Sequence, residues 1–383
     1  MKKSVILILF LFLALSVPVR AMGAETQQIE QDTYSKYLDQ YDVDSIYDSV
    51  PQDALDLLDE LGMQDFDFEN ILDLTPQKLW HVLQSVAEGR FKGPLTACAG
   101  MILLILFSAF LQSLKTTVKS DMLSNVFSVA CSVIIAVILS VEISDAISLA
   151  SSTIKMCADF IYGFVPVFGI LVAVSGGITA SFSTNALLLG LAQFLNFLSG
   201  NLFVPVISCY LALGLSNGIR PELHLTAITS AVKKYISAAV SLAATGFVSI
   251  LSIKTAVASR ADALGLRSAR FAINSVVPVI GSAISEGLLS IQSYSSLIKS
   301  TVGIVGIVVI VLIFLPALLE ILIWKFFLSV SSIASEMFED RSVLAVLQAF
   351  QGALLLMLIV LILSLVTTVI SFGILIAVKN QVS

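Results

Sequence analysis

The sequence predicts an all-α polytopic membrane protein, and its composition and apolar patterning carry this prediction. Of the 383 residues, 57% are hydrophobic and only 13% are charged, whereas a soluble domain carries about 25% charged residues. The mean hydropathy of +0.97 indicates that bilayer, and not water, surrounds most of the chain. Apolar stretches of roughly 20 residues, the length that spans hydrocarbon, recur from residue 95 onward. We expect about seven to eight transmembrane helices.

The first 24 residues have the pattern of a signal peptide. A short basic region at Lys2-Lys3 precedes an apolar run from Val5 to Val17, and small residues up to Ala24 offer a cleavage site. The apolar run is short for a spanning helix. A retained N-terminal anchor is the alternative interpretation of the same pattern.

Charge separates the remaining chain into two parts. Residues 25–90 contain 16 acidic and three basic residues, whereas residues 91–383 contain 11 acidic and 15 basic residues. The sequence therefore predicts an acidic extracytoplasmic segment at 25–92 and a multi-pass transmembrane domain at 93–383.

Two helices are expected within the acidic segment. One follows Pro51 and ends before Gly62, because proline suits a first helical turn and glycine suits the residue after a helix. The second begins at Thr75-Pro76 and carries an apolar stripe that includes Leu79 and Val82. We expect this stripe to pack against the first helix, with docking on a partner helix or on the bilayer surface as the alternative.

The apolar stretches give an approximate order of membrane segments. The stretch at 186–215 contains Ser199-Gly200-Asn201 and Pro205, so it can form one kinked helix or a helical hairpin. The last span is expected at 352–378. The earlier segments are expected at 95–114, 123–141, 160–177, 186–215, 236–253, 271–289 and 302–323.

Two apolar segments are interrupted by the same short pattern, 112 residues apart. Residues 160–169 align with residues 272–281, and five of the ten positions are identical, including Val-Pro-Val around Pro166 and Pro278 and the closing Gly169 and Gly281. Paired interruptions of this kind indicate discontinuous helices near a functional centre. The alternative is two unrelated proline kinks in a sequence of low diversity.

The similarity extends over two halves, at about 122–217 and 235–330. The halves are inverted in the membrane if 186–215 crosses once and parallel if it crosses twice. Four basic residues against one acidic residue at 254–270 favour a cytoplasmic loop there, because cytoplasmic loops are enriched in Lys and Arg. With residues 25–92 outside, this favours the inverted arrangement.

Glu286 is the polar residue of most interest at bilayer depth. An acidic side chain in hydrocarbon is costly and usually faces a cavity, a partner or an ion path, and Glu286 follows the second proline interruption. The alternative is that Glu286 lies at the membrane interface. Asn274, Asn185, Gln193 and Asn196 are further polar residues in the apolar segments. Glu320 is followed by Trp324 and Lys325, which is typical of an interface.

No motif of a soluble enzyme is present. The sequence lacks a phosphate-binding loop, a dinucleotide fingerprint, a zinc-protease motif and a nucleophile elbow. His81 and His224 have no Cys or His at ligand spacing, and the four cysteines stand singly in apolar surroundings. We expect no catalytic site, no cofactor, no metal site and no nucleic-acid partner. The candidate centre is the broken-helix region of Pro166, Gly169, Pro278, Gly281 and Glu286.

The stretch from Ser259 to Gly306 resembles the stage III sporulation protein AE family. The similarity is carried by Arg260-Ala261-Asp262 and by Pro278-Val279-Ile280-Gly281-Ser282-Ala283-Ile284-Ser285. This chain departs from the family with Ser-Glu-Gly where Ser-Asp-Ala is common, and with Ala-Asp-Ala-Leu in place of Ala-Asp-Gly-Val.

The resemblance implies a membrane component of the channel, or feeding-tube, complex that links the mother cell and the forespore. Expected partners are a cytoplasmic ATPase, ring-forming exported proteins, small membrane subunits and the lipid bilayer. The expected location is the mother-cell membrane around the forespore. The repeats and Glu286 leave a second reading open, a self-contained secondary transporter with a site around Pro278 to Glu286.

Overall fold

The computed structural model describes residues 43–63, 75–118, 121–174, 179–274 and 281–376. Every regular element in these ranges is helical, which confirms the all-α class. The elements are η1 (Val43–Ser49), α3 (Gln52–Leu61), α5 (Pro76–Val118), α6 (Asp121–Val174), α7 (Thr179–Leu198), the π-helical turn η2 (Ser199–Phe203), α8 (Val204–Ile219), η3 (Pro221–Leu223), α9 (Thr226–Asn274), α10 (Gly281–Met337) and α11 (Arg341–Ile376).

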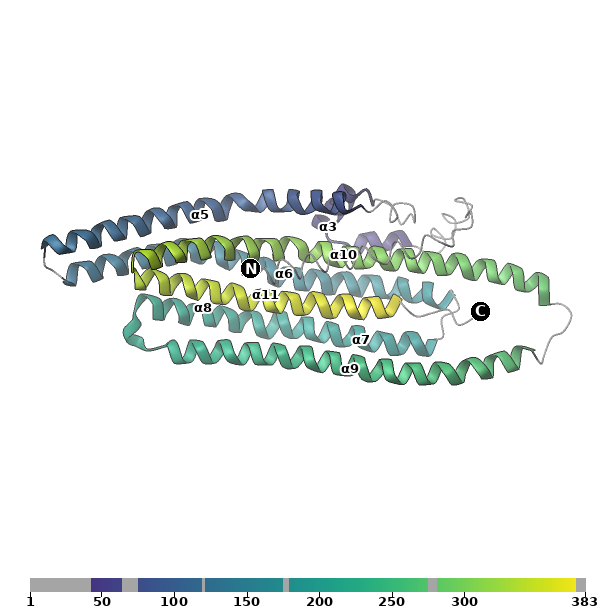
Figure 1. Cartoon of the computed structure of the whole chain (residues 1–383). Helices are drawn as coiled ribbons and strands as arrows, with labels where there is room; N and C mark the ends of the chain where they lie inside the picture. Colours follow the sequence, from purple (N-terminus) through teal and green to yellow (C-terminus); the bar gives the residue numbers. More distant parts are fainter. Residues whose placement is uncertain (1–42, 64–74, 119–120, 175–178, 275–280, 377–383) are drawn as a thin grey trace.

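The long helices lie side by side in an elongated bundle (Figure 1). The connections from α5 to α6, from α8 to α9 and from α10 to α11 lie at one end of the bundle, which we call the turn end. The chain enters α5 toward the opposite end, where α6 and α9 finish and α10 begins. Sequence neighbours are therefore antiparallel, except that α7, η2 and α8 form one continuous run.

Six helices within the described ranges are long and apolar enough to cross a membrane. The expected number was seven to eight, and one merger of two segments and one divided segment account for the difference. Residues 123–141 and 160–174 belong to the single helix α6, and residues 271–289 are divided between the end of α9 and the start of α10. The 57 residues of α10 extend about 85 Å, so this helix is much longer than a hydrocarbon core of roughly 30 Å.

Pro166 does not interrupt α6, contrary to the expected broken helix. The helix continues through Pro166 to Val174, and α10 likewise continues through Pro316. A proline removes one backbone donor and kinks a helix, but neighbouring helices can hold the two halves in line. Pro278, the partner of Pro166 in the repeat, lies outside the described residues.

The helical register changes instead at η2, in the run from α7 to α8. Its five residues form a π-helical turn in which the Val204 N–H donates to the Ser199 carbonyl. Pro205 comes two residues after this turn and has no N–H to donate to a carbonyl of the preceding turn. One added residue in that turn relieves the clash of the proline ring with the carbonyl four residues earlier. Residues 187–219 therefore form one kinked span, not a hairpin.

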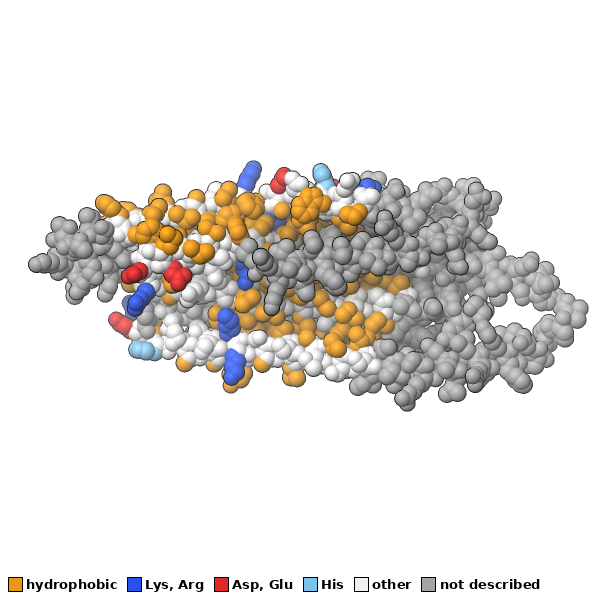
Figure 2. Space-filling view, viewed as in Figure 1, with side chains coloured by type: hydrophobic (Ala, Val, Ile, Leu, Met, Phe, Trp, Pro, Cys, Tyr) orange, Lys and Arg blue, Asp and Glu red, His pale blue; other side chains and the backbone are white. Residues whose placement is uncertain are grey.

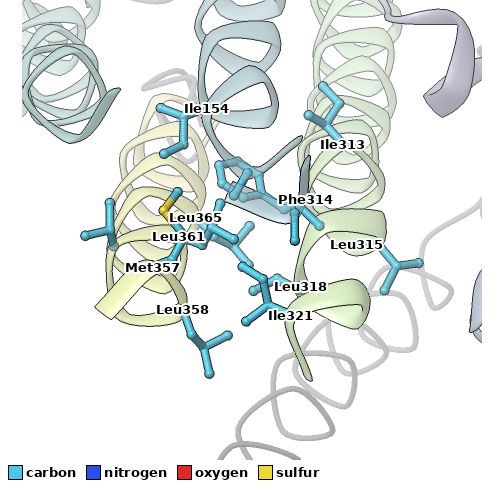
Figure 3. Packing of buried hydrophobic residues seen from close by; sticks show 14 of the residues in the cluster. Ile154, Ile313, Phe314, Leu315, Leu318, Ile321, Met357, Leu358, Leu361 and Leu365 are labelled. Carbon is cyan, nitrogen blue, oxygen red and sulfur yellow. The ribbon is translucent and has the colours of Figure 1, made fainter. Parts of the chain in front are cut away.

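The bundle core is formed mainly by α10 and α11, the most extensively paired helices. Their most apolar windows are 78% and 67% buried, whereas the other four spans keep one broad outer face. A helix that is apolar on all sides must be surrounded by other elements. Figure 3 shows Phe314, Leu318 and Ile321 of α10 facing Met357 and Leu361 of α11.

The acidic segment packs on the bundle. Helix α3 buries Ala54, Leu58 and Leu61, and Gly62 closes it with a left-handed φ of 78°. The Glu60 carboxylate lies 2.9 Å from His81 Nδ1 and accepts a hydrogen bond from Ser85 Oγ at 2.9 Å, which ties α3 to α5. The apolar stripe of α5 therefore packs inward, with Val82 buried, as the first of the two alternatives predicted.

Helix α5 runs without a break through residues 92 and 93, where the sequence suggested a boundary between segments. The segment η1 reaches across to α6. A methyl group on Gly163 would lie 2.5 Å from Ser49 Cβ, so this contact requires glycine. Residues 43–63 and the spans therefore share one hydrophobic core.

The structure corrects the expected orientation of the repeat. Residues 123–141 of α6 and 236–253 of α9 both run away from the turn end (Figure 1), so corresponding segments run parallel. The merger of 160–174 into α6 removes one crossing from the sequence-based count. As a result, residues 254–270 and the start of α5 flank the spans toward the same end of the bundle.

Large apolar side chains cover much of the outer surface, as expected for contact with lipid. Figure 2 shows them spread along the described surface, with few charged groups between them. Examples that are more than half exposed are Leu103, Phe110, Val137, Leu187, Phe194, Phe197 and Leu242.

Candidate functional site

The structure does not bring the predicted centre together within its described residues. Pro166 is exposed on α6, and Gly169 is partly buried one turn away. Pro278 lies outside the described residues. Gly281 begins α10 and Glu286 lies in its second turn, but their side chains lie outside the described part of the structure.

The surroundings of Pro166 are an aromatic packing cluster. Phe160, Phe164 and Phe168 are fully buried on one face of α6, and the Phe164 ring lies 4.7 Å, centroid to centroid, from Phe372 of α11. A methyl group on Gly306 of α10 would come within 2.7 Å of the Phe372 ring. The small residue thus lets α10 approach the aromatic rings closely.

A buried polar layer lies inside the bundle, where α6, α7 and α11 meet. Asn196 Nδ2 donates a hydrogen bond to Thr368 Oγ1 over 3.2 Å, and the Cys157 side chain of α6 lies beside Thr368. All three residues are at most 2% exposed. This contact fixes α6, α7 and α11 at a common height.

Three further hydroxyl residues lie one helical turn from this contact, all toward the turn end. Thr153 precedes Cys157 by four residues on α6, Ser199 follows Asn196 by three, and Ser364 precedes Thr368 by four on α11. Residues three or four apart share one face of a helix, so the three hydroxyls form a second level of the layer. We call Thr153, Ser199 and Ser364 the hydroxyl layer.

The hydroxyl layer is buried and has no protein partner among the described residues. The three side chains are between 0% and 1% exposed, and their oxygens, together with Asn196 Oδ1 and both amide atoms of Gln193, make no hydrogen bond within the described structure. Buried polar groups in native proteins nearly always have a partner, either protein or ordered water. These atoms therefore form the least satisfied polar cluster in the described interior.

A second polar contact joins α5 to α10. The Arg90 guanidinium forms an ion pair with the Glu320 carboxylate, and their side chains are 29% and 17% exposed. Trp324, one turn after Glu320, is packed inside the bundle at 2% exposure. Glu320 therefore has a partner on another helix, and its interfacial position stays a prediction.

The turn end is held by a buried carboxylate. Asp340 is 1% exposed and accepts hydrogen bonds from Ser108 Oγ of α5 at 2.5 Å and from Ser128 Oγ of α6 at 2.6 Å. Its carboxylate also accepts the Val343 N–H at 3.3 Å at the start of α11. One side chain thus joins α5, α6 and α11.

The chemistry available in the buried polar layer is hydrogen bonding by neutral groups. No cluster of three His, Cys, Asp or Glu side chains in the described residues is placed to hold a metal ion. Sequence reasoning singled out Gln193 and Asn196 but missed Thr153, Ser199 and Ser364. The missed signal was the recurrence of polar residues at helical spacing in apolar spans, as in Gln193, Asn196 and Ser199 on one run and Ser364, Thr367, Thr368 and Ser371 on another.

Comparison with known proteins identifies the family to which this chain is similar. The family model described as stage III sporulation protein AE matches residues 63–379, which includes all six candidate spans. The protein named "Stage III sporulation protein AE" from Bacillus subtilis (strain 168) is 23% identical over 220 residues, which is 57% of this chain and 54% of the relative. The match thus spans about half the length of that curated relative. No solved structure matches. Because the family model covers most of the sequence, the chain belongs to the stage III sporulation protein AE family.

Proposed function

We propose that this protein is a non-enzymatic integral membrane component of the sporulation channel, or feeding-tube, complex that links mother cell and forespore. In this role it is needed for forespore development after engulfment. The observation that supports the proposal is the family match over residues 63–379, which lies on a bundle of six membrane-length helices.

The proposal places the chain in the mother-cell membrane around the forespore, with residues 25–92 extracytoplasmic. A signal-peptide-like N-terminus and the excess of acidic residues at 25–90 support this orientation. The proposed partners are a cytoplasmic ATPase that supplies energy, ring-forming exported proteins and small membrane subunits. Outer faces of α5, α6, α7 and α9 that carry exposed apolar side chains provide surface for lipid and for other membrane subunits.

Deletion of the gene in its sporulating host tests the role. We expect sporulation to stop after engulfment, and we expect the tagged protein to be purified in detergent together with ring and ATPase partners. The purified protein alone in liposomes should show no saturable, ion-coupled solute uptake. Normal spores from the deletion strain would refute the proposal.

A self-contained permease is the second candidate, and the buried polar layer favours it. Neutral hydrogen-bonding groups inside a membrane bundle are typical of sites for polar solutes. If this candidate is right, the isolated protein takes up a solute saturably, and Glu286→Ala or Pro278→Ala abolishes uptake at unchanged protein abundance. If the component role is right, the same variants affect sporulation only through the assembled complex.

The orientation is tested by cysteine labelling of intact cells. In the proposed topology each of the six helices crosses the membrane once, so Gln52 and Ala263 lie on one side and Glu222 on the other. With the native cysteines replaced, a membrane-impermeant maleimide should label Cys introduced at Gln52 and at Ala263 but not at Glu222. Labelling at Gln52 without labelling at Ala263 would instead restore the sequence-based inverted arrangement.

A further inference from the structure

We propose that the hydroxyl layer of Thr153, Ser199 and Ser364 is a binding site for ordered water inside the bundle. This inference concerns the interior of the bundle and does not depend on the proposed role in sporulation. It rests on unpartnered buried oxygens, on the absence of charge in the layer, and on the π-helical turn at the same level.

The layer offers a matched set of donors and acceptors. Each of the three hydroxyls can donate one hydrogen bond and accept two, and Asn196 Oδ1 can accept further bonds. All four oxygens are buried without a partner among the described residues. A buried water typically makes about three hydrogen bonds to otherwise unsatisfied groups. Hydroxyls from three different helices, together with an amide oxygen, meet that requirement.

The neutrality of the layer selects water over an ion. None of the six side chains that form the two levels of the layer carries a charge. An ion in a buried site needs an opposite charge or a full set of ligands to offset the loss of its hydration. A water molecule needs neither, and it can donate to the Asn196 oxygen while it accepts from the hydroxyls.

The π-helical turn adds a backbone hydrogen-bond acceptor at the level of the hydroxyl layer. Ser199 is the first residue of η2, and Pro205 follows two residues after that turn ends. Because proline cannot donate, one carbonyl of the preceding turn lacks its helical partner. Waters commonly satisfy backbone groups at such irregularities in membrane helices.

A surface groove of about 380 Å³ lies between α6 and α8. One wall carries serines of α6, and the other carries Ser208 beside apolar residues of α8. Along the helices, Ser151 of the groove lies two residues before Thr153, and Val204 follows the π-helical turn, so the groove and the layer lie on neighbouring turns but on different faces of α6. The serines of α6 in the groove are Ser140, Ser144, Ser148 and Ser151.

The sign of a stability change tests the proposal. Thr153→Val and Ser364→Ala remove hydroxyls that we assign to water, so the melting temperature of the purified protein in detergent should fall. Removing an unpartnered polar group from a dry core is instead neutral or stabilising. An unchanged or raised melting temperature for both variants would overturn the proposal. Thr367→Val is the matched control, because its hydroxyl already donates to the Leu363 carbonyl of its own helix at 2.8 Å.

Radiolytic labelling gives an independent readout in the folded wild-type protein. Hydroxyl radicals formed in place from bound water oxidise the side chains beside that water. Cys157 and Cys98 are 0% and 4% exposed, but only Cys157 adjoins the hydroxyl layer. We expect oxidation at Cys157 to exceed oxidation at Cys98 several-fold. Equal labelling of the two cysteines contradicts a hydrated layer.

Discussion

Replacing Asp340 should loosen the turn end of the bundle more than any exposed substitution nearby. The Asp340 carboxylate accepts the hydroxyls of Ser108 and Ser128 at 2.5 Å and 2.6 Å, and it also accepts the Val343 N–H in the first turn of α11. Asp340→Ala removes all three bonds and leaves two hydroxyls in a buried position. It therefore separates α5, α6 and α11 at their common contact.

The magnitude follows from these bonds. Hydrogen bonds to a charged group contribute about 1.5 kcal/mol each at the lower end of the range, and loss of a helix cap costs about 1 kcal/mol. Together these values predict a loss of about 4 kcal/mol in the free energy of unfolding. The entropy of unfolding grows with chain length, to about 1 °C of melting temperature per kcal/mol for 383 residues, so the melting temperature should fall by roughly 5 °C.

The assay is thermal unfolding of the purified protein in detergent, followed by size-exclusion chromatography of the remaining folded fraction. Asp340→Asn keeps the shape and the cap but weakens the hydroxyl bonds, so its melting temperature should lie between those of wild type and Asp340→Ala. Glu336→Ala is the control, because Glu336 is exposed in the last turn of α10. If Asp340→Ala has the same melting temperature as the Glu336→Ala control, the carboxylate does not join the helices and the reasoning is wrong.

Two further predictions concern helix contacts within the bundle. Arg90→Glu should lower the melting temperature because it places two acids together. If the two side chains interact across α5 and α10, the double variant Arg90→Glu/Glu320→Arg should recover most of the loss. A double variant that melts no higher than Arg90→Glu would exclude the pairing. Gly352→Ala should cost about 1–3 kcal/mol through overpacking, because the added methyl would overlap Tyr210 Oη of α8, and Gly352→Ala/Tyr210→Phe should regain part of that loss in the same assay.

Local signals in the sequence predicted several elements well, because their causes are local. Thr75-Pro76 marks the start of α5, where the Lys78 N–H lies 3.4 Å from Thr75 Oγ1, and Gly62 ends α3 in the left-handed region that glycine adopts readily. The apolar composition predicted the membrane-length helices for the same reason. Whether a run of about 20 apolar residues can span a bilayer depends on its own length and composition.

The effect of Pro166 could not be read from its local pattern. A proline always removes one donor, but whether the helix breaks depends on the packing around it. In α6 the helix is held by the aromatic contacts of Phe164 and Phe168 with Phe372, so it continues to Val174. That single outcome changes the number of crossings and makes the corresponding segments of the repeat run parallel.

The sequence by itself determined the helical class, the acidic N-terminal segment and the family resemblance, since composition and local spacing carry all three. Only the tertiary structure decided the six spans, their directions and the buried polar layer. The layer joins Asn196 to Thr368, which are 172 positions apart, and no local pattern encodes such a contact. Hydrogen bonds between distant helices depend on the height and rotation of each helix, and the packing of the whole bundle sets both.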